Sequence, residues 1–122
     1  MTVAEAIQYA DEIAPNQYTQ AQKTRWLADL DGKTLREVFM THEKPGGGIW
    51  PVRETDGADE LLIPAPYAND VYVNYLLSRI AEANAEVGKY NLYAALFNTA
   101  YQDFANRYNR THEPKGAGVW RF

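Results

Sequence analysis

The sequence predicts an all-α protein, a bundle of about four helices with a long central loop. Three observations predict this fold. Apolar residues recur at helical intervals over four stretches. Each of these stretches begins or ends at a capping residue, a Pro or a Gly. One long stretch, from His42 to Tyr67, has no helical periodicity. A chain of 122 residues can bury a core of its own, so we expect a single domain over residues 1–122.

The first helix is expected at about residues 2–14. Thr2 and Glu5 have the spacing of a capping box. The residues that recur on one face before Pro15 are Val3, Ala6, Ile7, Ala10 and Ile13.

The second helix is expected at about residues 19–41, with Thr19 as its cap. Its apolar positions are Trp26, Leu27, Leu30, Val38 and Phe39. Asp31 and Gly32 in its middle would either bend one helix or divide two, because Gly weakens a helix interior. We expect one bent helix.

The third helix is expected at about residues 69–87, with Asn69 or Asp70 as its cap and Gly88 as its break. Its apolar face holds Val71, Tyr72, Tyr75, Leu76, Ile80, Ala83 and Val87.

The fourth helix is expected at about residues 90–110 and has the most regular pattern. Its apolar residues alternate in spacings of four and three, which keeps them within about 40° of one line. They are Tyr90, Ala94, Phe97, Tyr101, Phe104 and Tyr108, and the stripe is widened by Tyr93, Leu96 and Ala100. This stripe predicts packing along the helix rather than a cofactor site, with some Tyr hydroxyls at the edge of the core or in a subunit contact.

The central arm, about residues 43–67, contains two short apolar pieces, 49–52 and 61–63, that could form short β segments. A long loop without helix is typical of a functional arm or a partner-binding loop. A C-terminal tail is expected over residues 113–122.

Composition narrows the function. The net charge is -4, with 16 acidic and 12 basic side chains, so no basic face predicts binding to free nucleic acid. There is no cysteine, which excludes disulfides and thiolate chemistry. No apolar run approaches the roughly 18 residues of a membrane span, so we expect a soluble protein that does not enter membranes.

Residues that could carry chemistry have simpler explanations. His42 and His112 each lie in a Thr-His-Glu triplet and could bind a metal, but a His near a helix end also interacts well with the helix dipole. Ser78 lies in mid-helix without a nearby His. The loop acids Glu54, Asp56, Asp59 and Glu60 are typical of a solvated charge run. We therefore expect no catalytic residue, no metal and no cofactor.

One motif occurs twice. Residues 41–50 read THEKPGGGIW and residues 111–120 read THEPKGAGVW. Chance recurrence of helix-ending residues explains the His, Pro and Gly but not the β-branched residue followed by Trp. The alternative hypothesis is that both are hinged anchors that bury a Trp against a neighbouring subunit or partner. The candidate interface residues are Ile49, Trp50, Leu62, Ile63, Tyr101, Tyr108, Val119, Trp120 and Phe122.

The order of these segments resembles a known family. KTRWLADLDG, ELLIPAPYANDVYVNYLLSRIAEANAEVGKYN and LFNTAYQDFANRYNRTHEP look like the small helical head-tail connector (adaptor) proteins of tailed phages and prophages. The resemblance covers roughly residues 1–42 and 60–114. The GGG arm and the VWRF terminus depart from the family pattern.

The resemblance implies a structural protein of the virion neck, found in the host cytoplasm during assembly. It would form a homo-oligomeric ring of about twelve copies beneath the portal protein, extend the DNA channel without binding DNA specifically, and dock a downstream neck, stopper or tail-completion protein. Two alternatives stay open: a small helical binding or regulatory module that uses an aromatic groove, and an enzyme with a metal site at the acidic loop and the two His.

The anchor hypothesis gives a first prediction. Trp50→Ala and Trp120→Ala should each impair assembly while circular dichroism shows unchanged helix content, because an anchor contributes to a contact and not to the subunit's core. Loss of helical structure would instead place that Trp in the core.

Overall fold

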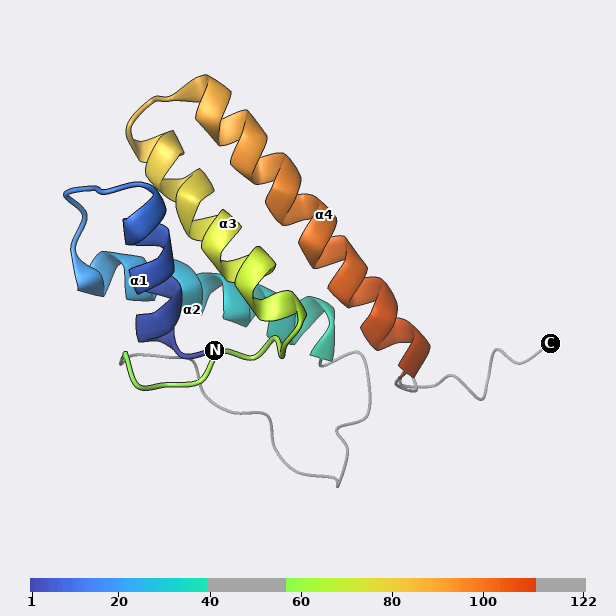
Figure 1. The fold of residues 1–122 in the computed structure, drawn as a ribbon. Coiled ribbons are helices and arrows are strands. Elements are labelled where there is room, and N and C mark those ends of the chain that lie inside the picture. The colour runs from blue at the N-terminus through green and yellow to red at the C-terminus, as the bar shows by residue number, and fades with distance from the viewer. Residues whose placement is uncertain (40–56, 112–122) are drawn as a thin grey trace.

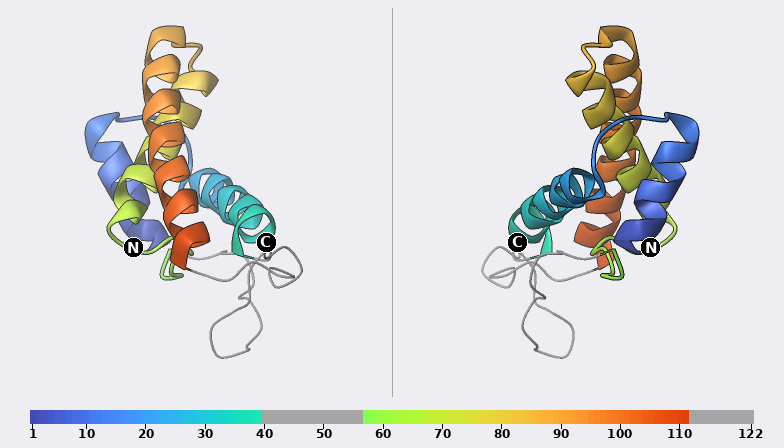
Figure 2. Two further views of the ribbon diagram at one scale, coloured as in Figure 1. Left: turned by 90° about the vertical axis from the view of Figure 1, so that its right-hand side faces the viewer. Right: turned by 90° about the vertical axis from the view of Figure 1, so that its left-hand side faces the viewer.

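The protein is all-α, as predicted (Figure 1). The computed structural model describes residues 1–39 and 57–111. Within those ranges the chain forms α1 (Val3–Ile13), α2 (Gln20–Glu37), α3 (Tyr67–Ala83) and α4 (Val87–Thr111). Helices α3 and α4 form an antiparallel hairpin, and α1 and α2 lie on opposite sides of it (Figure 2). The turn of the hairpin projects beyond both of them.

Helix α1 begins with the predicted capping box. The Glu5 amide donates to Thr2 Oγ1 at 3.2 Å, and the Thr2 amide donates to the Glu5 carboxylate at 2.9 Å. The hydrogen bond from the Thr2 amide, followed by one from the Thr2 side chain, lowers the pKa of the Glu5 carboxyl. The helix turns its small and branched residues inward, and the buried ones are Val3, Ala6, Ile7 and Ala10.

Helix α2 is a single helix that continues through Asp31 and Gly32, so these residues do not divide it. Thr19 caps it as predicted, accepting a hydrogen bond from the Gln22 amide. The helix ends at Glu37, before the expected position at 41, although Phe39 beyond it is still buried.

A buried lysine joins α2 to α1. Lys23 is only 4% exposed, and its Nζ lies 2.9 Å from both carboxylate oxygens of Asp11 and 3.2 Å from Asn16 Oδ1. The Asn16 amide nitrogen also donates to Asp11. A buried charge is tolerated when it is paired and hydrogen-bonded, so this cluster holds the connection between the two helices.

The bounds of α3 differ from the prediction at both ends. It begins after Pro66, without a side-chain cap, so neither Asn69 nor Asp70 caps it. It ends at Ala83, with Asn84 as its C-cap, and Gly88, the expected break, lies inside α4. The turn is made by Ala85 at φ 59°, with the Glu86 amide donating to the Ala81 carbonyl at 2.9 Å. This is a Schellman ending with Ala in the left-handed position that usually favours Gly.

The last part of the expected central arm, from Gly57 onward, packs on the helices. The Val3 amide donates to the Asp59 carbonyl at 3.0 Å, and the Ala4 amide donates to the Gly57 carbonyl at 2.9 Å. Glu60 forms one isolated antiparallel bridge with Thr2, and no strand forms in the described part of the chain. Residues 61–63 therefore serve as a core segment rather than as part of a free arm.

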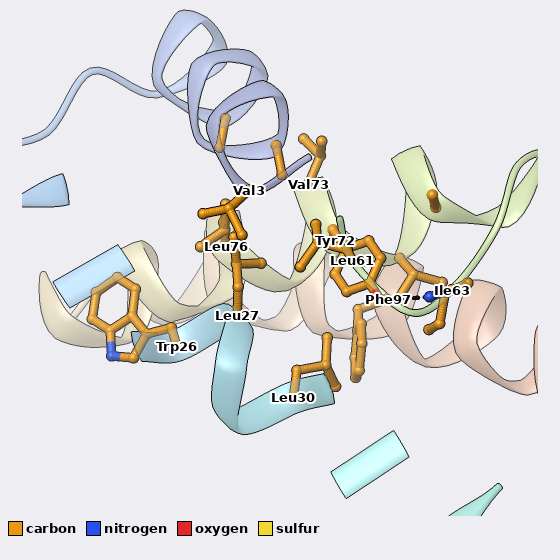
Figure 3. Close-up of a cluster of buried hydrophobic side chains, with 14 of the residues drawn as sticks. Val3, Trp26, Leu27, Leu30, Leu61, Ile63, Tyr72, Val73, Leu76 and Phe97 are labelled. Carbon is orange, nitrogen blue, oxygen red and sulfur yellow. Dashed lines mark hydrogen bonds between the residues drawn. The ribbon is translucent and has the colours of Figure 1, made fainter. Parts of the chain in front are cut away.

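The core gathers around a buried carboxylate. Asp31 is 1% exposed and accepts hydrogen bonds from the Leu62 amide at 2.9 Å and from the Tyr72 hydroxyl. The Tyr72 oxygen in turn accepts from the Ile63 amide at 2.8 Å (Figure 3). Side chains from all four helices and from residues 61–63 surround this network. It joins α2, α3 and the segment that precedes α3.

Tyr72→Phe should lower the free energy of unfolding by about 1–3 kcal/mol, because it leaves the buried Ile63 amide without its acceptor and removes one of the donors to Asp31. Urea unfolding measures the change. Tyr90→Phe is the matched control, since no hydrogen bond joins the Tyr90 hydroxyl to another described residue, and its effect should stay within about 0.5 kcal/mol. Equal effects of the two changes would show that the network does not stabilise the fold.

Candidate functional site

The predicted aromatic stripe of α4 faces the core. Phe97, Phe104 and Tyr108 are buried, and they are the residues of α4 with the least exposure. Ring contacts join Phe97 to Tyr75 of α3, with centroids 5.2 Å apart, and Tyr108 to Phe39, with centroids 4.8 Å apart. The stripe is therefore filled by the protein's own side chains and does not form an open groove for a partner helix.

Four of the predicted interface residues lie within the described ranges, and two of them are core residues. Ile63 is fully buried and Tyr108 is 6% exposed, so the expectation that they form an interface is corrected. Leu62 and Tyr101 are partly buried and pack against the core. The other candidates lie outside the described residues, and they are Ile49, Trp50, Val119, Trp120 and Phe122.

Tyr101 lies at the edge of the core, as expected for some hydroxyls of the stripe. Its hydroxyl donates to Glu37 at 3.5 Å, and the Lys33 ammonium lies 5.6 Å from its ring centroid. Burial is the largest cause that raises the pKa of the Tyr101 phenol, while a hydrogen bond with Thr34 lowers it. Tyr101 is thus a neutral hydroxyl at physiological pH.

Large apolar side chains remain exposed where α1 ends and α4 begins. Ile13 is 58% exposed, Val87 68%, Leu92 55% and Tyr9 41%. Ile13 also borders a hollow of about 290 Å³ between the end of α1 and the turn of the hairpin. We call this end of the molecule the turn end and the hollow the turn-end groove. The groove is lined by Ile13, Ala14, Pro15, Leu77, Ile80, Ala81, Asn84, Glu86, Lys89 and Tyr93.

The charges in the turn-end groove pair with each other. Lys89 Nζ lies 2.9 Å from the Glu86 carboxylate. The hydrogen bond between them lowers the pKa of Glu86 and raises the pKa of Lys89. The lining of the groove is therefore mixed, with more polar than apolar surface, and its two charged side chains form one ion pair.

A second hollow, of about 400 Å³, lies between the start of α3 and the middle of α4. We call it the mid-hairpin groove. Its apolar lining comes from Leu96, which is 46% exposed, and Ala100, and an Asp lies on each helix. The complete lining is Asp70, Asn74, Leu96, Thr99, Ala100 and Asp103.

The polar residues considered for catalysis have structural roles where they are described. Ser78 is buried in α3 and donates to the Tyr75 carbonyl at 2.7 Å. Asp59 and Glu60 lie in the segment beside α1, whereas His42 and His112 lie outside the described ranges. Within residues 1–39 and 57–111, no three His, Asp or Glu side chains converge as metal ligands. No helix there has the length and apolarity to cross a membrane.

Sequence reasoning missed the exposure of Ile13 and Val87, both of which it placed on apolar helix faces. Ile13 lies about 70° from the centre of the buried face of α1, which the 100° periodicity could have indicated. Val87 was missed because the expected helix break was wrong: it begins α4 and does not end α3. The mid-hairpin groove depends on the pairing of α3 with α4, which no local pattern reports.

Comparison of the chain with known protein families, curated proteins and solved structures finds no match among any of them.

Two adjacent residues of α4 test which of its faces is core. Phe97→Ala should lower the free energy of unfolding by about 3–5 kcal/mol because it opens a cavity against α3. Leu96→Ala should cost less than about 1 kcal/mol because nearly half of its surface is already exposed. Thermal or urea unfolding of the two variants gives the comparison. A larger loss from Leu96→Ala would contradict this assignment of the faces.

Proposed function

We propose that the protein is a head-tail connector of a tailed phage or prophage, a structural subunit that forms a ring beneath the portal and docks a neck or tail protein. The proposal rests on the resemblance of residues 1–42 and 60–114 to that family. The all-α fold agrees with it. The exposed apolar surface of the turn end is the observation that carries the docking role.

The turn end suits protein binding. Four large apolar side chains, Tyr9, Ile13, Val87 and Leu92, are exposed within the end of α1 and the first turns of α4. Single exposed apolar residues are ordinary, but several at the end of one helix and the start of another are typical of an interaction site. The turn of the hairpin, where Val87 begins α4, projects beyond α1 and α2 (Figure 2), so a partner can approach it.

Ring formation needs two different patches on each subunit, because a head-to-tail contact joins unlike surfaces. The turn end supplies one patch. The segment around Ile49 and Trp50, outside the described residues, is the second in this proposal. A net charge of -4 suits a channel through which DNA slides, since such a lumen should not hold phosphates.

A binding or regulatory module is the second candidate, and the exposed apolar side chains of the turn end favour it as well. An amphipathic helix of another protein could place its apolar face over Ile13 and Tyr93. This function needs only one patch and no ring. The two candidates therefore differ in whether the protein assembles on a portal.

Co-purification with the portal ring from the same genome tests the connector. The wild type should bind, and Ile13→Lys with Val87→Lys should weaken binding at least about tenfold, because two charges replace exposed apolar contacts. Gln8→Lys with Asn106→Lys is the matched control, since both positions are exposed and polar on the same two helices.

If the wild type binds no portal of that genome, the connector proposal is wrong. Binding by the wild type and by both double variants would retain the connector but remove the turn end from the contact.

A further inference from the structure

We propose that the mid-hairpin groove binds the segment Val119–Phe122 (VWRF) of the same chain. Trp120 would lie over Leu96 and Ala100, and Arg121 would lie between Asp70 and Asp103. The proposal concerns a site other than the turn end and does not depend on the connector function. It gives Trp120 an intrachain contact in place of the intersubunit contact of the anchor hypothesis. The groove, its charges and the length of chain beyond α4 support it in turn.

The groove provides an apolar floor for an aromatic residue. Leu96 is 46% exposed, and the 400 Å³ hollow beside it lies along the seam between α3 and α4. In the described chain only three side chains of this 25-residue helix are buried. An indole placed there would remove apolar surface of both Trp120 and Leu96 from water, which is favourable in proportion to the area covered.

The charges of the groove select a basic segment. Asp70 and Asp103 approach the hollow from α3 and α4, and no Lys or Arg of the described residues forms an ion pair with either carboxylate. The turn-end groove differs, because its Glu86 is already paired with Lys89. VWRF combines apolar residues with one Arg, and a guanidinium can donate to two carboxylates at once.

The segment is long enough to reach the groove. Helix α4 ends at Thr111, and Ala100 lies 11 residues earlier, which is about 17 Å along a helix. Trp120 lies nine residues beyond Thr111, a span of up to about 30 Å when extended. The chain can therefore reverse direction after α4 and still bring Trp120 to the level of Ala100.

The short linker also indicates that the segment in the groove comes from the same chain and not from a second copy of the protein. A segment tethered by a short linker is present at its site at an effective concentration in the millimolar range. The same segment of a second copy, present at micromolar concentration, therefore competes poorly for the groove. The occupant is accordingly the segment of the same chain.

Disulfide trapping tests the proposal on the isolated protein, which has no native cysteine. Thr99→Cys lines the groove and is paired with Val119→Cys in the segment. Under mild oxidation this pair should form an intrachain disulfide at least about tenfold faster than a pair that lacks the docked geometry. Non-reducing electrophoresis separates intrachain from interchain products.

The matched control is Asn98→Cys with Val119→Cys. Asn98 neighbours Thr99 at the same distance from the end of α4 but is rotated about 100° around the helix, and it does not line the groove. Equal rates for the two pairs, or no intrachain product from the Thr99 pair, would overturn the proposal. Interchain dimers alone would assign the groove to a second copy and overturn it too.

A charge exchange provides the second measurement. Asp103→Arg should slow trapping of the Thr99 pair by opposing Arg121, and adding Arg121→Asp should restore the rate, because the ion pair is then rebuilt in reverse. A rate unaffected by Asp103→Arg would show that the carboxylates do not recognise the segment. The proposal fails in that case as well.

Discussion

The buried carboxylate of Asp31 is the constraint on which the rest of the structure depends. A charged or polar group away from water is tolerated only with hydrogen-bonding partners, and here the partners come from α3, through Tyr72, and from the backbone at residues 62 and 63. Satisfying them fixes how α3 lies against α2 and where the preceding segment runs. That segment, held from Gly57 to Leu61 by backbone hydrogen bonds to residues 1–4, also holds the start of α1. One polar network thus fixes the relative positions of α1, α2 and α3, which no short stretch of sequence could specify.

In this arrangement one face of α4 stabilises the fold, and its other sides are available for contacts. The face with Phe97 and Phe104 completes the core, whereas the sides that carry Leu92 and Leu96 stay exposed. Because α1 and α2 flank α3 and neither covers the turn of the hairpin (Figure 2), the start of α4 projects from the body. The two proposals use different parts of this surface. In the first proposal the turn end binds another protein, and in the second the mid-hairpin groove binds the chain's own VWRF segment.

Where sequence reasoning succeeded, the signals were local. The capping box of α1, the Thr19 cap of α2 and the aromatic stripe of α4 depend on residues within one or two turns of each other. The errors have physical causes. The turn after α3 forms at Ala85 and not at Gly88, because tertiary packing of the hairpin sustains a left-handed Ala that propensity disfavours. For the candidate site, the sequence predicted that apolar residues would form an interface. It did not predict that Ile13 and Val87 are exposed.

The sequence by itself determined that the protein is all-α, with four helices in this order and an apolar stripe on the last one, because capping and helical periodicity are properties of neighbouring residues. Only the tertiary structure decided which apolar groups are core and which are surface. Ile63, expected at an interface, is buried beneath α3, and Lys23, a polar residue on α2, is buried because Asp11 and Asn16 hold its ammonium. A periodic pattern reports which residues share a face. What covers that face depends on partners distant in the chain, and these are known only once the helices have packed.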